Sequence, residues 1–446
     1  MTKVTYPALP PAPATTGDLY TTLSSSQYNP AARSLSARWH PLLGWQTARI
    51  GAGLHPHGRV AMARTATKMM ALDPAGRPMS GINFASQDYL SLSQHQGLLA
   101  AATAALSWCA LHSNGTAPLM GLSTPLIALE TRVAQFLRLP EAAVFPSGAE
   151  ANRAAIRTLI RAGDHVLIDA AAHSALFEAA LYITRHVHRT PPGSTDAVER
   201  RLRRIRRENP GAGILVATSA VAAFSAAIPD LAALADLCRE HGATLLVDVA
   251  HDLGAMGPTG RGVLELQGVL ARVDVVTGSF AKCFGSNGGF VAARDPALKP
   301  ALRFAPGGQG SSSALSPLQA AIVLAAFDIV ESPEGAVRRQ RLLANVLRLR
   351  NHLMADGFTV MGRSAPFVPV RLENLPLARQ MTAAIESAGA LVILLENPVV
   401  AGHAPRWRLQ LMADHSTADI DQFATLARAL RPSRTPKPRA KAATVC

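Results

Sequence analysis

Cysteines, aromatic residues and long apolar runs are all scarce in this sequence of 446 residues, and each scarcity excludes a class of protein. The four cysteines stand singly, without the paired spacing of a zinc site or a redox motif, so we expect reduced thiols and no bound metal. Aromatic residues make up 5% and do not alternate with basic runs, which argues against binding of single-stranded nucleic acid. No apolar run approaches the roughly 20 residues that cross a membrane, and the N-terminal residues lack the apolar core of a secretory signal. We therefore expect a cytoplasmic protein.

Lysine is also rare, with six residues against thirty-eight arginines. One of the six, Lys282, lies in a loop of small residues between two short apolar runs, within Val273–Arg294. A guanidinium stays protonated, whereas a desolvated amine can lose its proton and attack a carbonyl group. We therefore interpret Lys282 as a candidate Schiff-base lysine. The alternative, from this segment alone, is an ordinary solvated loop lysine.

The net charge of +14 favours an acidic partner or substrate. The densest basic cluster, Arg200–Asn209, has the pattern of one helix face and does not resemble a nucleic-acid arm. A thioester that carries phosphate groups, or an acidic carrier protein, would be attracted by this field.

Short apolar runs alternate with helical patterns from Ala142 onward, which is typical of a mostly parallel sheet buried on both faces. We predict an α/β fold with such a central sheet, followed by a smaller α+β unit. The predicted limits are 1–60 for an N-terminal arm, 61–315 for the large domain, 316–432 for the small domain and 433–446 for a basic disordered tail.

Polar residues follow the strands of the predicted sheet, where ligands of such sheets bind. Each residue taken alone is more typical of a turn or a helix cap, but together they predict a site. These residues are Gly148, Asp169, His173, Asp248, His251, Ser279 and Lys282.

The combination suits pyridoxal phosphate, which needs a lysine, an acid opposite the ring nitrogen and a phosphate cradle. Asp248 ends the apolar run TLLVD, and a buried carboxylate there requires a cationic partner such as a pyridinium. The amides of Gly148 and Ala149 can bind a phosphate where the next helix begins, and the Ser279 hydroxyl can add a contact.

The motifs FASQDYLSL, FPSGAEAN, IDAAAHSALFEAA, TLLVDVAH, GSFAKCFGSNGGF and RWRLQLMADHS occur in this order. As a set they resemble those of the α-oxoamine synthases, pyridoxal-phosphate enzymes of fold type I, over residues 83–430. The resemblance implies a decarboxylative condensation of an amino acid with an acyl thioester, carried by coenzyme A or a carrier protein. It also implies a homodimer with shared active sites.

Position by position, the resemblance implies that Lys282 binds the cofactor and moves protons, and that Asp248 contacts the pyridine nitrogen. It places His173 on the ring face and His251 at the ring oxygen, and it implies that Ser279, Gly148 and Ala149 hold the phosphate. Ser312 would reach the phosphate of the neighbouring subunit, and Arg408 would bind the carboxylate of the amino acid.

The sequence departs from the family in two segments, both on the substrate side. Within Thr218–Asp230, Ala223 stands where the family has serine, and within Ala117–Leu126 the family arginine and histidine are Ala117 and Leu126. The phenylalanine before Ser312 is also replaced, by Ser311. Two alternatives therefore stay open, which are an aminotransferase-like enzyme and a noncatalytic partner subunit.

Overall fold

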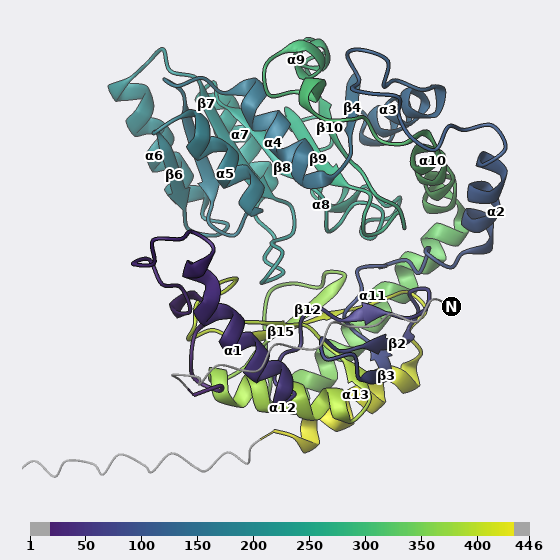
Figure 1. Ribbon diagram of the computed structural model, residues 1–446. Helices are drawn as coiled ribbons and strands as arrows, with labels where there is room; N and C mark the ends of the chain where they lie inside the picture. Colours follow the sequence, from purple (N-terminus) through teal and green to yellow (C-terminus); the bar gives the residue numbers. More distant parts are fainter. Residues whose placement is uncertain (1–17, 432–446) are drawn as a thin grey trace, which may run out of the picture.

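The computed structural model describes residues 18–431, and residues 1–17 and 432–446 lie outside this range. Two lobes lie one above the other in Figure 1, the upper one built around a seven-stranded sheet and the lower one around two smaller sheets. In the described part of the chain, no helix is long and apolar enough to cross a membrane.

The large sheet has the strand order β4-β10-β9-β8-β7-β5-β6. Its strands are parallel except for β10, which is antiparallel to its neighbours. This confirms the predicted, mostly parallel sheet, although the edge strand β6 was not predicted because its short sequence VHRT lacks an apolar run. The strands are β4 (Glu141–Phe145), β5 (His165–Asp169), β6 (Val187–Thr190), β7 (Ile214–Ser219), β8 (Thr244–Asp248), β9 (Val275–Ser279) and β10 (Gly289–Ala293).

Successive strand residues enter two separate cores, one on each face of this sheet. In β8, Leu246 packs on one face and Leu245 and Val247 on the other, as the two-residue period of a strand requires. Helices α4 (Gly148–Leu159), α5 (Ser174–Ile183) and α9 (Leu298–Phe304) cover the first face. The second is covered by α3 (Thr124–Leu137), α6 (Thr195–Glu208), α7 (Leu231–Glu240) and α10 (Pro317–Glu331), with α2 (Gln96–Ala105) against α10.

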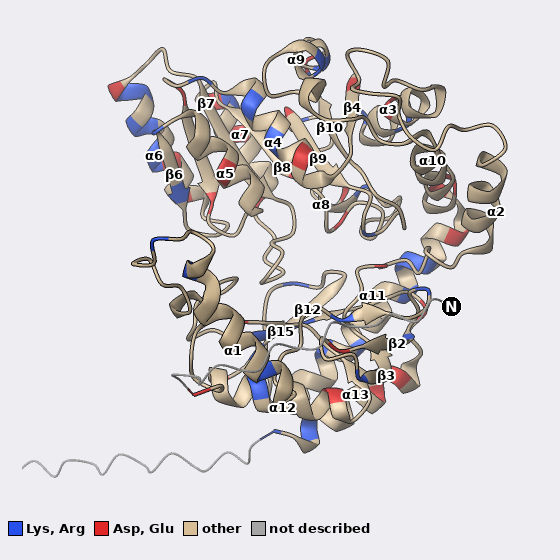
Figure 2. Ribbon diagram, viewed as in Figure 1, with Lys and Arg blue, Asp and Glu red and all other residues tan. Residues whose placement is uncertain are grey.

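The basic cluster Arg200–Asn209 falls on α6, which lies beside the edge strand β6 and carries several of the blue segments in Figure 2. Its apolar residues Val198, Leu202 and Ile205 are buried, so the arginines occupy the remaining faces. This confirms that the cluster belongs to a helix.

The small lobe contains a four-stranded antiparallel sheet of order β11-β12-β15-β14, as predicted for a smaller α+β unit. Its strands are β11 (Thr359–Val360), β12 (Phe367–Arg371), β14 (Leu394–Leu395) and β15 (Arg406–Gln410). Three helices pack around it, α11 (Pro333–Ala355), α12 (Leu375–Ser387) and α13 (Thr417–Ala429).

The N-terminal strands join this lobe. Strands β1 (Val60–Ala61), β2 (Lys68–Leu72) and β3 (Pro78–Asn83) form a sheet with β13 (Ala390–Leu391), in which β3 and β13 are parallel. The domain limits therefore stay a prediction, with the addition that residues 60–83 pair with the C-terminal part of the chain. The predicted N-terminal arm contains one α-helix among its described residues, α1 (His40–Gly51), and the expected basic tail lies outside the described residues.

Candidate active site

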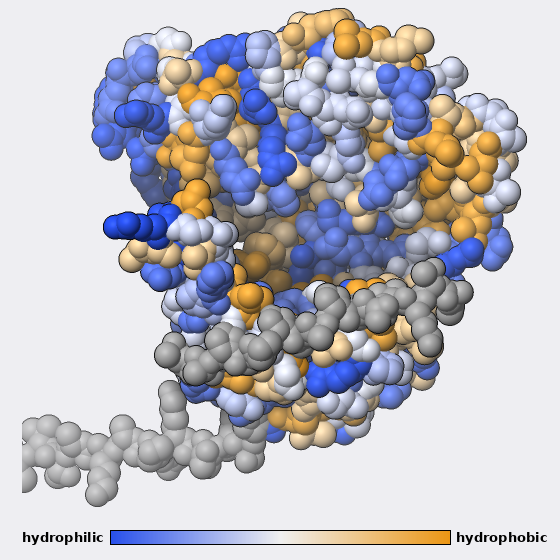
Figure 3. Space-filling model, viewed as in Figure 1, coloured by the Kyte–Doolittle hydropathy of each residue, from blue (hydrophilic) through white to orange (hydrophobic). Residues whose placement is uncertain are grey.

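The predicted polar residues gather where the central strands end. Asp248, the last residue of β8, lies opposite Ser219 of β7 and Thr277 of β9 in the sheet register. Because β7, β8 and β9 are parallel, their carboxyl ends open toward the same side of the sheet. Figure 3 shows the surface hollowed between the two lobes.

Lys282 follows β9 by three residues and is half-buried. Burial lowers the pKa of its ammonium from 10.5, the charge of Asp248 opposes this shift, and that of Arg408 reinforces it. The structure therefore places Lys282 in a charged, partly desolvated site, unlike a freely solvated loop lysine. A lowered pKa increases the fraction of neutral amine, the nucleophilic form.

Asp248 is buried in a network of neutral groups. Its Oδ2 accepts from Nδ2 of Asn152 at 2.7 Å, and its Oδ1 accepts from the amide of Ala250 at 2.9 Å. Thr277 Oγ1 in turn donates to Asn152 Oδ1 at 2.6 Å. None of the residues described forms an ion pair with this carboxylate. A buried acid without a counter-ion fits a cationic ring nitrogen.

Gly148 and Ser279 form a close-packed junction at the start of α4. A Cβ added to Gly148 would lie 2.7 Å from the Cβ of Ser279, so only glycine fits without a shift. Ser147 caps the helix by accepting from the amide of Glu150. The first turn of a helix leaves amides without intrahelical acceptors, so Gly148, Ala149 and the Ser279 hydroxyl together suit a phosphate group.

His251 is buried between two donors. Its Nδ1 lies 3.0 Å from the Tyr89 hydroxyl and 3.4 Å from Nη2 of Arg408. Burial lowers the pKa of His251 well below its usual value, and the charges of Lys282, Arg408 and His173 act in the same direction. Since a guanidinium can only donate, Nδ1 must accept and the proton must be on Nε2. The Nε2–H group is then available as a donor.

Arg408, on β15 of the small lobe, is a buried cation without an anion in the described part of the chain. Its guanidinium lies 4.6 Å from the centre of the Phe367 ring, and Nε has no hydrogen-bond partner. Burial lowers the pKa of Arg408, whereas the neighbouring Tyr89 raises it. Such a group suits a carboxylate of the substrate.

The other predicted residues occupy more peripheral positions. His173 lies after β5 and caps α5, since its Nδ1 accepts from the amide of Ala175, and its ring is exposed. Asp169 accepts from the amides of Ala171 and Gly193, which is turn chemistry. Ser312 makes its only side-chain hydrogen bond within residues 18–431 to the carbonyl of Ser313 and contacts none of the predicted site residues that way.

Asn152, Thr277 and Tyr89 are site residues that the sequence analysis missed. Asn152 lies one turn after Gly148 in FPSGAEAN and Tyr89 lies in FASQDYLSL, so both motifs carried a signal. The sequence around Thr277 did not indicate a site residue, because threonine is common within apolar strands.

The departures from the family pattern lie in packed surroundings. Ala117 and Leu126 are buried, so apolar contacts replace an arginine and a histidine there. In the other segment, Ala226 has a left-handed φ of 52°. Its carbonyl accepts from the amide of Arg363, which links this loop to the small lobe.

Two groups of known proteins are similar to this chain. The 8-amino-7-oxononanoate synthase of Geobacter metallireducens is 34% identical over 345 residues, or 77% of this chain and 87% of that protein. The synthase of Salmonella typhimurium is 33% identical over 343 residues, with the same coverage of both chains. Among solved structures, Sphingomonas wittichii serine palmitoyltransferase (SPT) has a TM-score of 0.82 and 25% identity, covering 89% of this chain and 98% of its own. A high-resolution SPT structure with PLP has a TM-score of 0.82 and 26% identity, with the same coverage of both chains.

Together, the fold and the site define a fold type I transferase that depends on pyridoxal phosphate. The sequence matches the aminotransferase class I and II family over residues 80–426. The chain belongs to this family and, within it, to the α-oxoamine synthases.

Proposed function

We propose that this protein is a pyridoxal-phosphate-dependent acyltransferase that joins an α-amino acid to an acyl thioester. The observation that carries the proposal is Arg408, a buried cation without an anionic partner among residues 18–431. It contacts His251, the histidine whose pKa is lowered in part by the charge of Lys282. A carboxylate bound to Arg408 would bring the α carbon of an amino acid into the reach of Lys282. The 8-amino-7-oxononanoate synthases and serine palmitoyltransferase named above support this reaction class.

The residues would hold the cofactor in four ways. Asp248 would pair with the ring nitrogen, and the Nε2–H of His251 would donate to the ring hydroxyl. Ser279 and the amides of Gly148 and Ala149 would bind the phosphate, and His173 would cover one face of the ring. When bound, the cofactor accepts the electron pair left on the α carbon after a bond to that carbon breaks.

Lys282 moves the proton. Its neutral amine takes the proton from the α carbon. The resulting carbanion attacks the thioester carbonyl and expels a thiolate, which takes a proton from the solvent. The substrate carboxylate leaves as carbon dioxide, and Lys282 returns a proton to the same carbon. The amino acid and the acyl thioester are thus converted into an α-amino ketone, carbon dioxide and a free thiol.

The test is release of free thiol from acyl thioesters in the presence of single amino acids. We expect release that depends on the amino acid and is lost in Lys282→Ala, while Lys68→Ala, which alters an exposed lysine, keeps it. Amino-group transfer to an oxo acid without thiol release would instead favour the aminotransferase alternative. A protein that binds pyridoxal phosphate but turns over no amino acid would support the noncatalytic alternative.

The acyl carrier, the assembly and the location extend the proposal. Coenzyme A and an acidic carrier protein both suit the net charge of +14. The segment between α2 and α3 exposes Trp108, Leu111, Leu119 and Met120, which supports a homodimer through this region. In that dimer Ser312 reaches the phosphate of the neighbouring subunit, and sedimentation would give the mass. We further propose a cytoplasmic location, which fractionation would check.

A further inference from the structure

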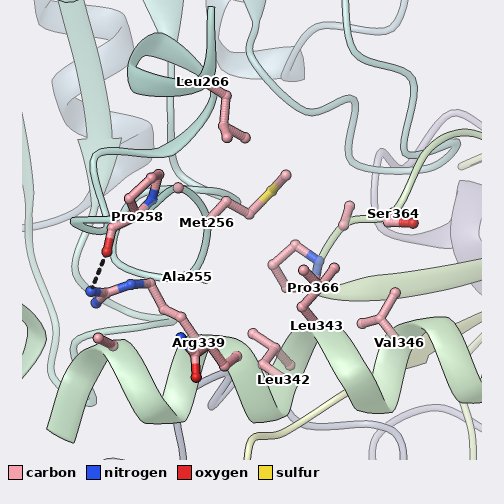
Figure 4. Close-up of a pocket in the computed structure, with 14 residues that line it drawn as sticks. Ala255, Met256, Pro258, Leu266, Arg339, Leu342, Leu343, Val346, Ser364 and Pro366 are labelled. Carbon is pink, nitrogen blue, oxygen red and sulfur yellow. Dashed lines mark hydrogen bonds between the residues drawn. The ribbon is translucent and has the colours of Figure 1, made fainter. Parts of the chain in front are cut away.

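An apolar cavity of about 370 Å³ lies between the lobes, outside the candidate active site (Figure 4). This volume falls within the roughly 300–1,000 Å³ of small-molecule sites. One wall is the loop Ala255–Pro258 together with Leu266, at the end of α8 (Gly262–Leu266). The other walls are α11 and the segment Ser364–Pro366, and none of the predicted catalytic residues lines the cavity.

The cavity exposes apolar side chains to water. Leu343 is 51% exposed and Leu266 is 55% exposed, while Leu342 and Val346 are buried beneath them. Figure 4 shows Met256 and Pro366 on facing sides of the space. Covering apolar surface is favourable, so an alkyl chain would be stabilised here.

Arg339 adds a charge to one wall. It is 6% exposed, and its guanidinium donates to the carbonyls of Val330 at 2.7 Å and Pro258 at 2.9 Å. Nε has no partner, and no carboxylate in residues 18–431 forms an ion pair with this cation. Burial lowers the pKa of Arg339. The nearby acid Glu265, which opposes this shift, is already bonded to Thr259 and to the amide of Arg261. The cavity therefore combines an apolar lining with an uncompensated buried cation.

The walls are continuous with the active site. Ala255 follows His251 by four residues, and Pro366 immediately precedes Phe367, which lies against both His251 and Arg408. A ligand here would contact both lobes at once, beside the residues that hold the substrate and the cofactor.

We propose that this cavity binds a medium-length alkyl chain with a carboxylate head, the chain between α11 and the Ala255–Leu266 loop and the head at Arg339. The charge of the head is the specific part of the proposal, since a buried cation favours an anion and disfavours an ammonium. The site does not depend on the acyl-transfer reaction.

Calorimetric titration of the protein loaded with pyridoxal phosphate tests the head group. Octanoate should bind saturably, and octylamine and octanol should bind at least about tenfold more weakly, because they lack the anion. Equal affinity for octanoate and octylamine, or for octanoate and octanol, would overturn the proposed contact with Arg339.

Two matched variants test the location. Leu343→Trp fills the cavity and should weaken octanoate binding by at least about tenfold. Leu347→Trp places the same side chain one turn further along α11, outside the cavity, and should leave binding unchanged. Unchanged octanoate binding in Leu343→Trp would overturn the proposal and would point to the acyl-chain region of the active site. Both positions are on the exposed face of α11, so the two variants are expected to fold.

Discussion

Asn152 orients Asp248, the one acidic residue that we assign to cofactor binding. Its side-chain amide donates to the Asp248 carboxylate at 2.7 Å and accepts a hydrogen bond from the Thr277 hydroxyl at 2.6 Å. All three side chains are buried. A neutral donor stabilises the ionised carboxylate without supplying a competing cation. The network therefore orients Asp248 and leaves its ion-pair partner to come from the ligand.

Replacing Asn152 by Leu should weaken binding of pyridoxal phosphate. A hydrogen bond to a charged group contributes about 1.5–3 kcal/mol, so we expect a roughly 10- to 100-fold loss of affinity. The measurement is a titration of the cofactor-free protein followed by absorbance. Thr158→Val is the control, because Thr158 is buried on the same helix and its hydroxyl has no partner among the described residues. Equal losses in both variants would assign the effect to the stability of α4.

The pKa of Lys282 can be measured without the cofactor. Since burial lowers this pKa from 10.5, acylation of Lys282 in the cofactor-free protein should reach half its maximal rate below pH 10.5. Asp248 raises the pKa, so Asp248→Asn should move the midpoint lower still. Mass spectrometry of tryptic peptides after brief reaction with acetic anhydride gives both rates, with exposed Lys68 as an internal reference. A midpoint at or above 10.5 would contradict the desolvated site.

At the scale of elements, apolar strands followed by polar residues could be predicted from the sequence. In β8 the apolar run ends in Asp248, and in β9 two valines precede a polar end at Ser279. Parallel strands bring such ends together whatever the details of packing. Side chains that enter the site from helices and loops, such as Asn152 and Tyr89, could not be assigned to the site from the sequence. Helical periodicity shows which residues share a face of a helix, but it does not show what that face contacts.

The junction of α4 with β9 allows an element-scale prediction. A methyl group on Gly148 would collide with Ser279, and overpacking of this kind costs about 1–3 kcal/mol through a shift of the helix start. Gly148→Ala should therefore lower the affinity for pyridoxal phosphate by roughly tenfold or more. Gly163→Ala is the matched control, since its Cβ would meet nothing within 4 Å. An unchanged affinity in Gly148→Ala would remove the start of α4 from the phosphate cradle.

At the scale of the whole molecule, the N-terminal segment belongs to the small lobe. Ile82 pairs with Ala390 across more than three hundred residues, and such a pairing has no local signature in the sequence. The same holds for Arg408, which reaches His251 only because the two lobes meet. The sequence therefore predicts the elements of each lobe better than it predicts the contacts between distant segments and between the two lobes.

A buried ion cluster fixes this arrangement. Glu396 pairs with Arg49 of α1 and with Arg379 of α12, both at 2.7 Å. Arg379 also donates to the carbonyls of Leu19, Tyr20 and Thr22. One carboxylate thus pairs with two buried cations and ties residues 18–51 to the lobe.

Glu396→Gln should destabilise the protein in a way that depends on pH. Burial raises the pKa of Glu396, but His57, Arg49 and Arg379 together lower it to about 2 from 4.5. At about 1.36 kcal/mol per pKa unit, this shift contributes about 3 kcal/mol above pH 4.5, which is lost as the pH falls toward 2.

The difference in unfolding free energy between wild type and Glu396→Gln should therefore be largest at neutral pH and shrink below pH 4.5. Urea unfolding at a series of pH values measures it, and Glu373→Gln, at an exposed acid of the same lobe, should differ from wild type by less than about 0.5 kcal/mol. A difference that stays constant from neutral pH to pH 3 would mean that the charge of Glu396 does not hold the N-terminal segment. Because α1 and the strands β1–β3 complete the small lobe that carries Arg408, loss of this anchor should also weaken amino-acid binding before the large lobe unfolds.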